Sequence, residues 1–309
     1  MNDRKRPEER ITDAIIESLE RGVVPWKKPW ESLTGAYGAP AAPQRITGEA
    51  YQGINFIMLA MRAAMSGYTG RTWMTYRQAA ELGGQVRKGE TSTLAIYYGQ
   101  AKSKTEAGDD SEGGSYRFLK GYPVFNVDQI DGLDAKFYAV PEAVSLTPAE
   151  EQARLEHIEA FISRQCADLS WRGDQAYYAP GPDHIRLPEW RLFRDGEQAY
   201  ATALHELVHW TAHKSRLERD LSGSFGSASY AFEELVADIG ACYLGQRLGL
   251  RPDHIEDHAS YVGSWLRKLR NDPRMILKAA SQAQAAADFL WERAGMASAP
   301  VAEDLAEAA

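Results

Sequence analysis

A short stretch at positions 205–210, HELVHW, places two histidines four residues apart with a glutamate after the first. On an α-helix, positions i and i+4 share a face, so the His205 and His209 side chains project together and could bind one metal ion. Glu206 lies one step round the helix, within reach of a water on that ion. This is the H-E-x-x-H pattern of zinc hydrolases, whose glutamate acts as general base. The pattern also arises by chance on polar helix faces, so a third ligand has to decide.

A second stretch, YAFEELVADIGACYL at positions 230–244, offers that ligand. Its apolar residues have helical spacing, and Glu234 and Asp238, four apart, share a face. Two histidines and a glutamate form a known catalytic zinc set with an open fourth position, and Asp238 could accept the spare ring N–H of a ligating histidine. We expect Glu233 to lie on a solvated face. The sequence therefore predicts one zinc ion per chain on three ligands, His205, His209 and Glu234.

Other polar residues near these motifs allow more than one interpretation. His213 lies eight residues from His205, about 12 Å along a helix axis, so the two cannot share an ion, and we place His213 near the rim of a cleft. The hydroxyl of Tyr200 or Tyr230 could stabilise an oxyanion, although core tyrosines are commoner. Residues 185–187, closed by a proline, could form a sheet edge that pairs with extended peptide, or simply close a sheet.

Periodicity and turn residues outline the elements that must position this site. In the second half they predict helices near 148–165, around HELVH, at 229–248, within 255–270 and within 273–295, with short strands within 176–187. In the first half they predict helices at 8–21 and 54–66, strands at 93–99 and 116–127, and a flexible polar loop at 100–115 between them. The fold class we predict is α+β in two domains, a small mixed-sheet N-terminal domain and a C-terminal domain.

Composition narrows the class of protein. The longest apolar run, FIMLAM at 56–61, is far shorter than the ~20 residues of a membrane span, so we expect no membrane contact. Two cysteines, Cys166 and Cys242, cannot form a disulfide framework, so we expect buried thiols and a cytoplasmic location. We also expect a monomer. Residues 1–99 hold 13 Lys and Arg against 10 Asp and Glu, whereas residues 151–309 hold 17 against 24. Any nucleic-acid contact should therefore come from the first hundred residues.

Several motifs, taken in order, resemble the ArdC-type antirestriction proteins of conjugative plasmids. In the first half these are PWKKPW, YQGINFIML, WMTYRQAAELGGQVRKGE and VFNVDQIDGL; in the second they are DHIRLP, YATALHELVHWTAHKSRLERDL, YAFEELVADIGACYLG and YVGSWLRKLRNDPR. The resemblance implies a single-stranded DNA-binding domain over 1–145, a zincin-like metallopeptidase domain over 146–296 and a disordered tail over 297–309. It places the metal on His205, His209 and Glu234, with Glu206 as the catalytic base.

The first domain also carries residue types that hold single-stranded DNA, which binds to aromatic platforms and cationic grooves. PWKKPWE and RTWMTYRQ intersperse tryptophan and tyrosine with cations, and the turn GGQVRKGE could present backbone amides to a phosphate. The alternative is that the tryptophans fill the core and the lysines face solvent. The candidates for DNA contact are Trp26, Lys27, Lys28, Trp30, Tyr51, Asn55, Trp73, Tyr76, Arg77, Arg87 and Lys88.

Two hypotheses of function follow. In the first, the protein is an antirestriction zinc metallopeptidase that binds single-stranded DNA, cleaves a protein or peptide substrate and protects plasmid DNA during conjugation. In the alternative, it protects DNA by coating it, and zinc only stabilises the fold. Glu206 discriminates between them, because a structural zinc needs no base beside an open position. A zinc nuclease is a weaker third hypothesis, since an acidic second half suits phosphates poorly.

Overall fold

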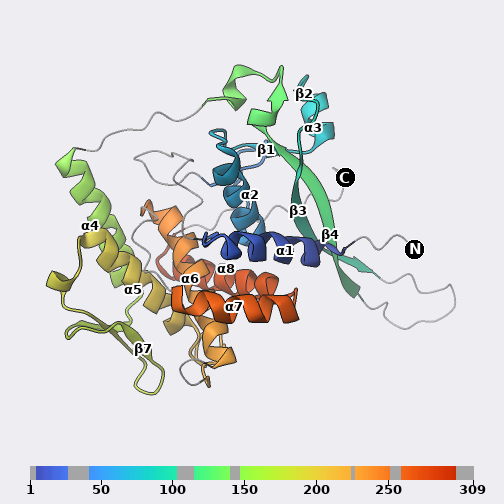
Figure 1. Ribbon diagram of the computed structural model, residues 1–309. Helices are drawn as coiled ribbons and strands as arrows, with labels where there is room; N and C mark the ends of the chain where they lie inside the picture. Colours follow the sequence, from blue (N-terminus) through green and yellow to red (C-terminus); the bar gives the residue numbers. More distant parts are fainter. Residues whose placement is uncertain are drawn as a thin grey trace.

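The structure, a computed structural model, describes residues 5–26, 42–102, 115–139, 147–223, 227–250 and 259–296 (Figure 1). The described residues of the N-terminal half form three α-helices and five strands in two small antiparallel sheets, with a parallel bridge between Gln44 and Thr72. The α+β class is confirmed. The elements of this half are α1 (Pro7–Glu20), α2 (Gly53–Ser66), β1 (Trp73–Met74), α3 (Tyr76–Glu81), β2 (Gln85–Val86), β3 (Thr93–Lys102), β4 (Ser115–Asn126) and β5 (Ile130–Asp131).

A long hairpin of β3 and β4 dominates this half, in the order β1-β4-β3. Its register pairs Ile96 with Gly121 and Tyr97 with Lys120, so alternate pairs face opposite sides. One face, with Ile96, packs against the helices; the other, with Ala95, belongs to a second cluster around Trp73. Gly121 allows α1 to approach, because a Cβ there would lie 3.3 Å from Pro7. The predicted strands are confirmed, and most of the predicted loop, residues 103–114, lies outside the described residues.

The outer edge of β3 is covered by a side chain. Asn55, in the first turn of α2, donates from Nδ2 to the Ile96 carbonyl and accepts the Ile96 N–H at Oδ1, both at 2.8 Å. The amide therefore takes the place of a neighbouring strand at this residue. α2 itself ends where predicted, at Gly67, whose φ of 68° is a left-handed cap.

In the described part of the C-terminal half, five α-helices pack together, and a three-stranded sheet of order β6-β8-β7 lies against α5. Every helix predicted there is present. α4 begins with a capping box, in which Thr147 and Glu150 bond each other's backbone N–H groups, and with Pro148 in its first turn. The elements are α4 (Pro148–Arg164), β6 (Asp168–Trp171), β7 (Tyr177–Ala179), β8 (His184–Leu187), α5 (Gly196–Thr211), α6 (Ala228–Leu248), α7 (Ala259–Asn271) and α8 (Met275–Arg293).

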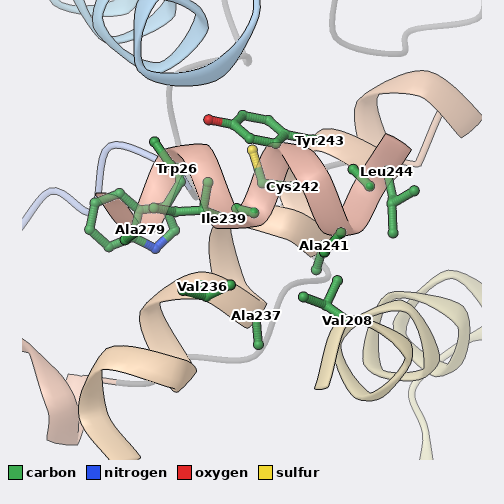
Figure 2. Packing of buried hydrophobic residues seen from close by; sticks show 14 of the residues in the cluster. Trp26, Val208, Val236, Ala237, Ile239, Ala241, Cys242, Tyr243, Leu244 and Ala279 are labelled. Carbon is green, nitrogen blue, oxygen red and sulfur yellow. The ribbon is translucent and has the colours of Figure 1, made fainter. Parts of the chain in front are cut away.

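The largest hydrophobic cluster runs through both halves. Residues of α1 and α2 pack with residues of α6, α7 and α8 in one continuous core. Trp26 is fully buried at this junction; its ring lies 5.5 Å from that of Trp265, and Figure 2 shows it beside Ile239 of α6 and Ala279 of α8. The predicted division at residue 145 and the tail at 297–309 fall outside the described residues. The two domains therefore share buried apolar surface.

Close contact between α5 and α6 is achieved with small residues. A Cβ added at Gly240 would lie 2.8 Å from a γ-carbon of Val208, so only glycine fits at this crossing. Figure 2 shows Val208 facing Ala237 and Ala241 of α6. This crossing brings together the two helices that carry the predicted metal ligands.

The cysteine prediction was half wrong. Cys242 is buried in α6, and burial raises the pKa of its thiol well above the usual value. Cys166 is exposed, in a turn after α4 where its φ is 50°. The turn directs its side chain away from the core, which the residue type alone does not reveal.

Candidate metal centre

α5 presents the HELVH residues at the floor of a cleft. Asp195 caps the helix by accepting the Gln198 N–H, and apolar neighbours such as Leu204 and Leu207 are fully buried on the core side. One helical turn then brings the Nε2 atoms of His205 and His209 to 3.1 Å from each other. The polar residues of the motif therefore share one buried face.

α6 supplies the third side chain. Carboxylate oxygens of Glu234 lie 3.6 Å from His205 Nε2 and 3.5 Å from His209 Nε2. A tetrahedral ion with ligands at about 2.1 Å separates its ligand atoms by about 3.4 Å. The three donors, which all lie within 4.8 Å of one another, therefore have the spacing that one tetrahedral divalent ion requires.

Two further carboxylates orient the imidazoles. Asp238, fully buried, lies 3.2 Å from His205 Nδ1, and Glu233 lies 3.2 Å from His209 Nδ1. Each contact leaves the Nε2 atom directed at Glu234, as in metal sites whose histidines donate their second ring N–H to a carboxylate. The expectation of a solvated Glu233 was wrong: its side chain is only 7% exposed, because α6 is enclosed on that side as well.

Arg219 completes the arrangement and was missed in the sequence. Its guanidinium donates to both Glu233 oxygens, at 2.7 and 3.1 Å, and also to Thr211 Oγ1 and the Val208 carbonyl. Its side chain is 4% exposed. The guanidinium therefore fixes Glu233 against α5. Arg219 lies in a loop without periodicity, so only its place in RLERDL, within one of the family motifs, could have drawn attention to it.

The centre is strongly negative around its histidines. Burial lowers the pKa of His209, but the bonds to Glu233 and Glu234 outweigh it and raise the pKa to about 9. Burial also lowers the pKa of His205, but its contacts with Asp238 and Glu234 outweigh burial and raise that pKa. Burial raises the pKa of Glu234, but its contacts with the two histidines outweigh burial and lower that pKa. When both imidazoles are neutral, the four carboxylates of this site, including Glu206, carry more negative charge than the Arg219 guanidinium neutralises. A divalent cation fits this donor set in both charge and geometry.

A cleft of about 610 Å³ opens over the three donors. Glu206, in the same turn as His205, lies on its surface. β7 borders the cleft and is an edge strand, because it pairs only with β8 in its sheet. The sheet edge suggested for residues 185–187 is therefore elsewhere: these residues form β8, the central strand. The cleft is lined by residues 174–178, Pro180, Pro188, Ala201, Thr202, His205, Glu206, His209, Asp220, Leu221, Gly223, Tyr230, Glu233 and Glu234.

The remaining candidates around the cleft separate into two groups. Tyr230 lines it, whereas the Tyr200 hydroxyl bonds Glu159 at 3.3 Å on the other side of α5. His213 bonds Ser215 outside the cleft lining. His184 joins β8 to β6 through Asp168. Of the two tyrosines, only Tyr230 is placed to meet a substrate.

The proposed DNA-stacking residues are mostly interior. Trp26 and Trp73 have no exposed surface and Tyr51 is 4% exposed, so in this conformation none of the three can stack on a base. Asn55 is committed to Ile96 of β3. In this small domain the three large rings fill the core, and the Asn55 amide caps the edge of β3.

The exposed candidates are three cations, two of which pair with carboxylates, and one tyrosine. Tyr76 is 52% exposed, Arg77 pairs with Glu81 at 2.8 Å, and Arg87 pairs with Glu90 at 2.8 Å. Lys88 is exposed in the following turn. Three more candidates lie outside the described residues: Lys27, Lys28 and Trp30.

Comparison with known proteins identifies the family to which this chain belongs. A model of the N-terminal domain of anti-restriction factor ArdC matches residues 5–125, and a model of a zincin-like metallopeptidase matches residues 156–282. The metal-free crystal structure of the antirestriction ArdC protein from the R388 plasmid is 43% identical, with a TM-score of 0.76, over 93% of this chain and 97% of that chain. This chain belongs to the ArdC antirestriction family.

Further relatives are similar to this chain over most of its length. A Mn(II)-bound structure of the R388 protein has a TM-score of 0.73 at the same identity and coverage. The uncharacterized protein y4eC of Sinorhizobium fredii is 39% identical over 91% of this chain and 90% of its own length. A DNA primase TraC of Escherichia coli is 38% identical over 94% of this chain, which spans only 20% of that primase.

The ArdC architecture therefore consists of the family's N-terminal domain joined to a zincin-like domain with a His-His-Glu site. None of the helices in the described part of the chain is long and apolar enough to cross a membrane.

Proposed function

We propose that this chain is a zinc-dependent peptidase that binds single-stranded DNA and protects incoming plasmid DNA from restriction during conjugation. The observation that carries the enzymatic part is the tetrahedral spacing of His205, His209 and Glu234 beneath an open cleft that also holds Glu206. A structural zinc needs a fourth protein ligand rather than a cleft and a neighbouring base. We further propose that the protein acts in the cytoplasm as a monomer.

Zinc on these three residues would supply a Lewis acid that polarises a peptide carbonyl and acidifies a water molecule. Glu206 then takes the proton from the water as its oxygen attacks the carbonyl carbon. The same carboxyl returns the proton to the leaving nitrogen as the C–N bond breaks. Asp238 and Glu233 hold the imidazole rings in place during these steps, since each contacts the Nδ1 atom of one of them. Tyr230 lines the cleft, and we assign its hydroxyl the role of donor to the developing oxyanion.

The substrate is an extended segment of protein. β7 offers one unpaired backbone edge along the cleft, and Tyr177 and Tyr178 lie on its surface. Pairing with this edge holds a peptide in a fixed register, while side-chain pockets select its sequence. A component of a restriction system is the class of protein that would connect cleavage to protection.

The test is Glu206→Gln, compared with His205→Ala in the full chain. The amide keeps the shape of the side chain but cannot accept a proton, so we expect peptide hydrolysis to fall at least ~100-fold. Zinc content, by elemental analysis, should stay at one per chain in Glu206→Gln and drop sharply in His205→Ala. Full zinc content in His205→Ala would refute the ligand assignment.

Protection is measured separately, as the frequency of conjugative transfer into a restricting host. If cleavage causes protection, Glu206→Gln loses both. A variant that no longer cleaves yet still protects would instead favour the second mechanism, in which the protein coats single-stranded DNA and the metal only stabilises the fold.

A further inference from the structure

The β3–β4 hairpin carries a row of aromatic rings on the face directed away from α1. Tyr97 and Phe118 lie in edge-to-face contact, with centroids 6.3 Å apart and planes at 69°. Phe118 is 37% exposed and Tyr97 is half-buried. Further along β4, on the same face, Tyr122 is buried in the cluster around Trp73. The exposure of the rings therefore increases along this face, from Tyr122 in the core to Phe118 at the surface.

Gly99 makes room for the exposed end of this row. Register places it opposite Phe118, and a Cβ at position 99 would lie 2.2 Å from Cζ of the Phe118 ring. The ring therefore rests against bare backbone on the neighbouring strand. Any larger residue at position 99 would displace it.

Cations accompany the rings. Lys120 is the exposed cross-strand partner of Tyr97 and so lies on the same face. Arg45 lies with its guanidinium 4.6 Å from the ring centroid of Tyr51, in the cluster from which the row emerges. Within the described part of the chain neither cation forms an ion pair with a carboxylate, in contrast to Arg77 and Arg87.

From these observations we infer that the face formed by Tyr97, Phe118, Lys120 and Arg45 is the surface that binds single-stranded DNA. This inference rests on the proposed function and locates it. Exposed rings interleaved with unpaired cations match the two parts of single-stranded DNA, bases that stack and phosphates that need neutralising. In Figure 1 the hairpin lies on the side of the molecule opposite to β7, so bound DNA leaves the cleft open.

The test measures binding of a fluorescently labelled oligothymidine to the full-length chain by fluorescence anisotropy at fixed salt. Loss of one stacking platform should weaken binding about 5-fold or more in Phe118→Ala and in Tyr97→Ala. Phe118→Tyr keeps a ring and should bind as the wild type does. Gly99→Ala, which retains every aromatic residue, should weaken binding by displacing Phe118. Lys120→Gln should weaken binding and reduce the slope of log affinity against log salt by about 1.

The chain provides a matched control in Tyr98, the next residue along β3. It is 57% exposed but lies on the opposite face, where burial and the nearby Glu8 carboxylate raise its pKa. Tyr98→Ala should bind within twofold of wild type. A cooperative thermal unfolding transition above the assay temperature and wild-type zinc content in every variant would exclude misfolding.

Each unfavourable outcome has its own meaning. Wild-type affinity in Phe118→Ala, Tyr97→Ala and Lys120→Gln would overturn the location while leaving DNA binding intact. A wild-type chain that binds no oligothymidine would refute the DNA-binding part of the proposed function itself. Self-association that is lost in Phe118→Ala would show, in sedimentation, that a second copy of the chain covers this face, and would likewise overturn the inference.

Discussion

At the scale of single residues, the buried pair of Arg219 and Glu233 distinguishes this site from a simple set of ligands. The pair connects the loop after α5 to α6, and Glu233 in turn contacts the Nδ1 atom of His209. Removing one member of a buried ion pair leaves the other charged and desolvated, which is far more costly than the loss of an exposed pair. The contribution of Arg219 should therefore be large although it contacts neither metal nor substrate.

We expect Arg219→Gln to destabilise the fold by about 3–5 kcal/mol and to weaken zinc binding by about 10–100-fold. Arg270→Gln is the matched control, since its pair with Glu20 is about half exposed at both ends and should contribute less than about 1 kcal/mol. Urea unfolding and competition with a chelator measure the two effects. Equal losses in the two variants would contradict a special role for the buried pair.

The proximity of His205, His209 and Glu234 could be predicted from the sequence, because helix periodicity fixes which residues share a face. The environment of Glu233 could not. Two adjacent glutamates point in directions about 100° apart, and the usual solvated face is missing here because the loop with Arg219 covers it. Contacts made by irregular loops leave no periodic signal in a sequence.

At the scale of secondary-structure elements, the distance between α5 and α6 decides whether a metal can be held. The ligands on α5 and the ligand on α6 meet only because Gly240 lets Val208 approach its backbone. Helix pairs packed this closely respond to a single methyl group, since interiors have no free volume to absorb it.

Gly240→Ala should therefore destabilise the protein by about 1–3 kcal/mol through overpacking and lower its zinc affinity. Gly245→Ala, in the same helix, should instead stabilise it by up to about 1 kcal/mol, because its new Cβ would meet Leu250 at an ordinary 3.6 Å. Thermal unfolding gives the two signs, and adding Val208→Ala to Gly240→Ala should restore part of the loss. If both glycine replacements stabilised the protein, the contact between α5 and α6 would have enough free space for a methyl group.

The long elements were accessible from sequence, whereas the shortest were not. α1, α2, α4, α5, α7 and α8 carry an apolar stripe over three or more turns, whereas α6 is a 21-residue helix whose described side chains are buried on almost every side. Thr147-Pro148 marks a helix start directly. α3 has six residues and β1, β2 and β5 have two each, which is too short for a period to appear. Their positions depend on partners far away in the chain, such as Asn126 opposite Trp73.

At the scale of the whole molecule, the two domains share one hydrophobic core. Trp26, predicted as a base-stacking residue, instead packs against Trp265 of α7 and lies beside Ile239 of α6 (Figure 2). The Trp265 indole donates in turn to the Ala231 carbonyl of α6. The segment after α1 therefore supports the helix that supplies Glu234.

We expect Trp26→Ala to cost about 3–5 kcal/mol of stability and to lower the unfolding temperature of both domains in a single transition. The folded fraction should bind single-stranded DNA with wild-type affinity, because the ring is fully buried. Calorimetry and anisotropy provide the two readouts. Two separate transitions, with only the first shifted, would contradict a shared core.

The Asn55 bridge to Ile96 has a consequence for the protein in a crowded cell. Exposed sheet edges recruit strands from other chains, and the aggregates that follow grow by the same backbone pairing that builds a sheet. β3 lies at such an edge, next to a flank of exposed aromatic rings that would favour sticking. The Asn55 amide occupies both backbone groups of Ile96, so a strand from another chain cannot pair with β3 at this residue. The hairpin can therefore expose aromatic rings on one face, while its outer edge at β3 resists the addition of strands from other chains.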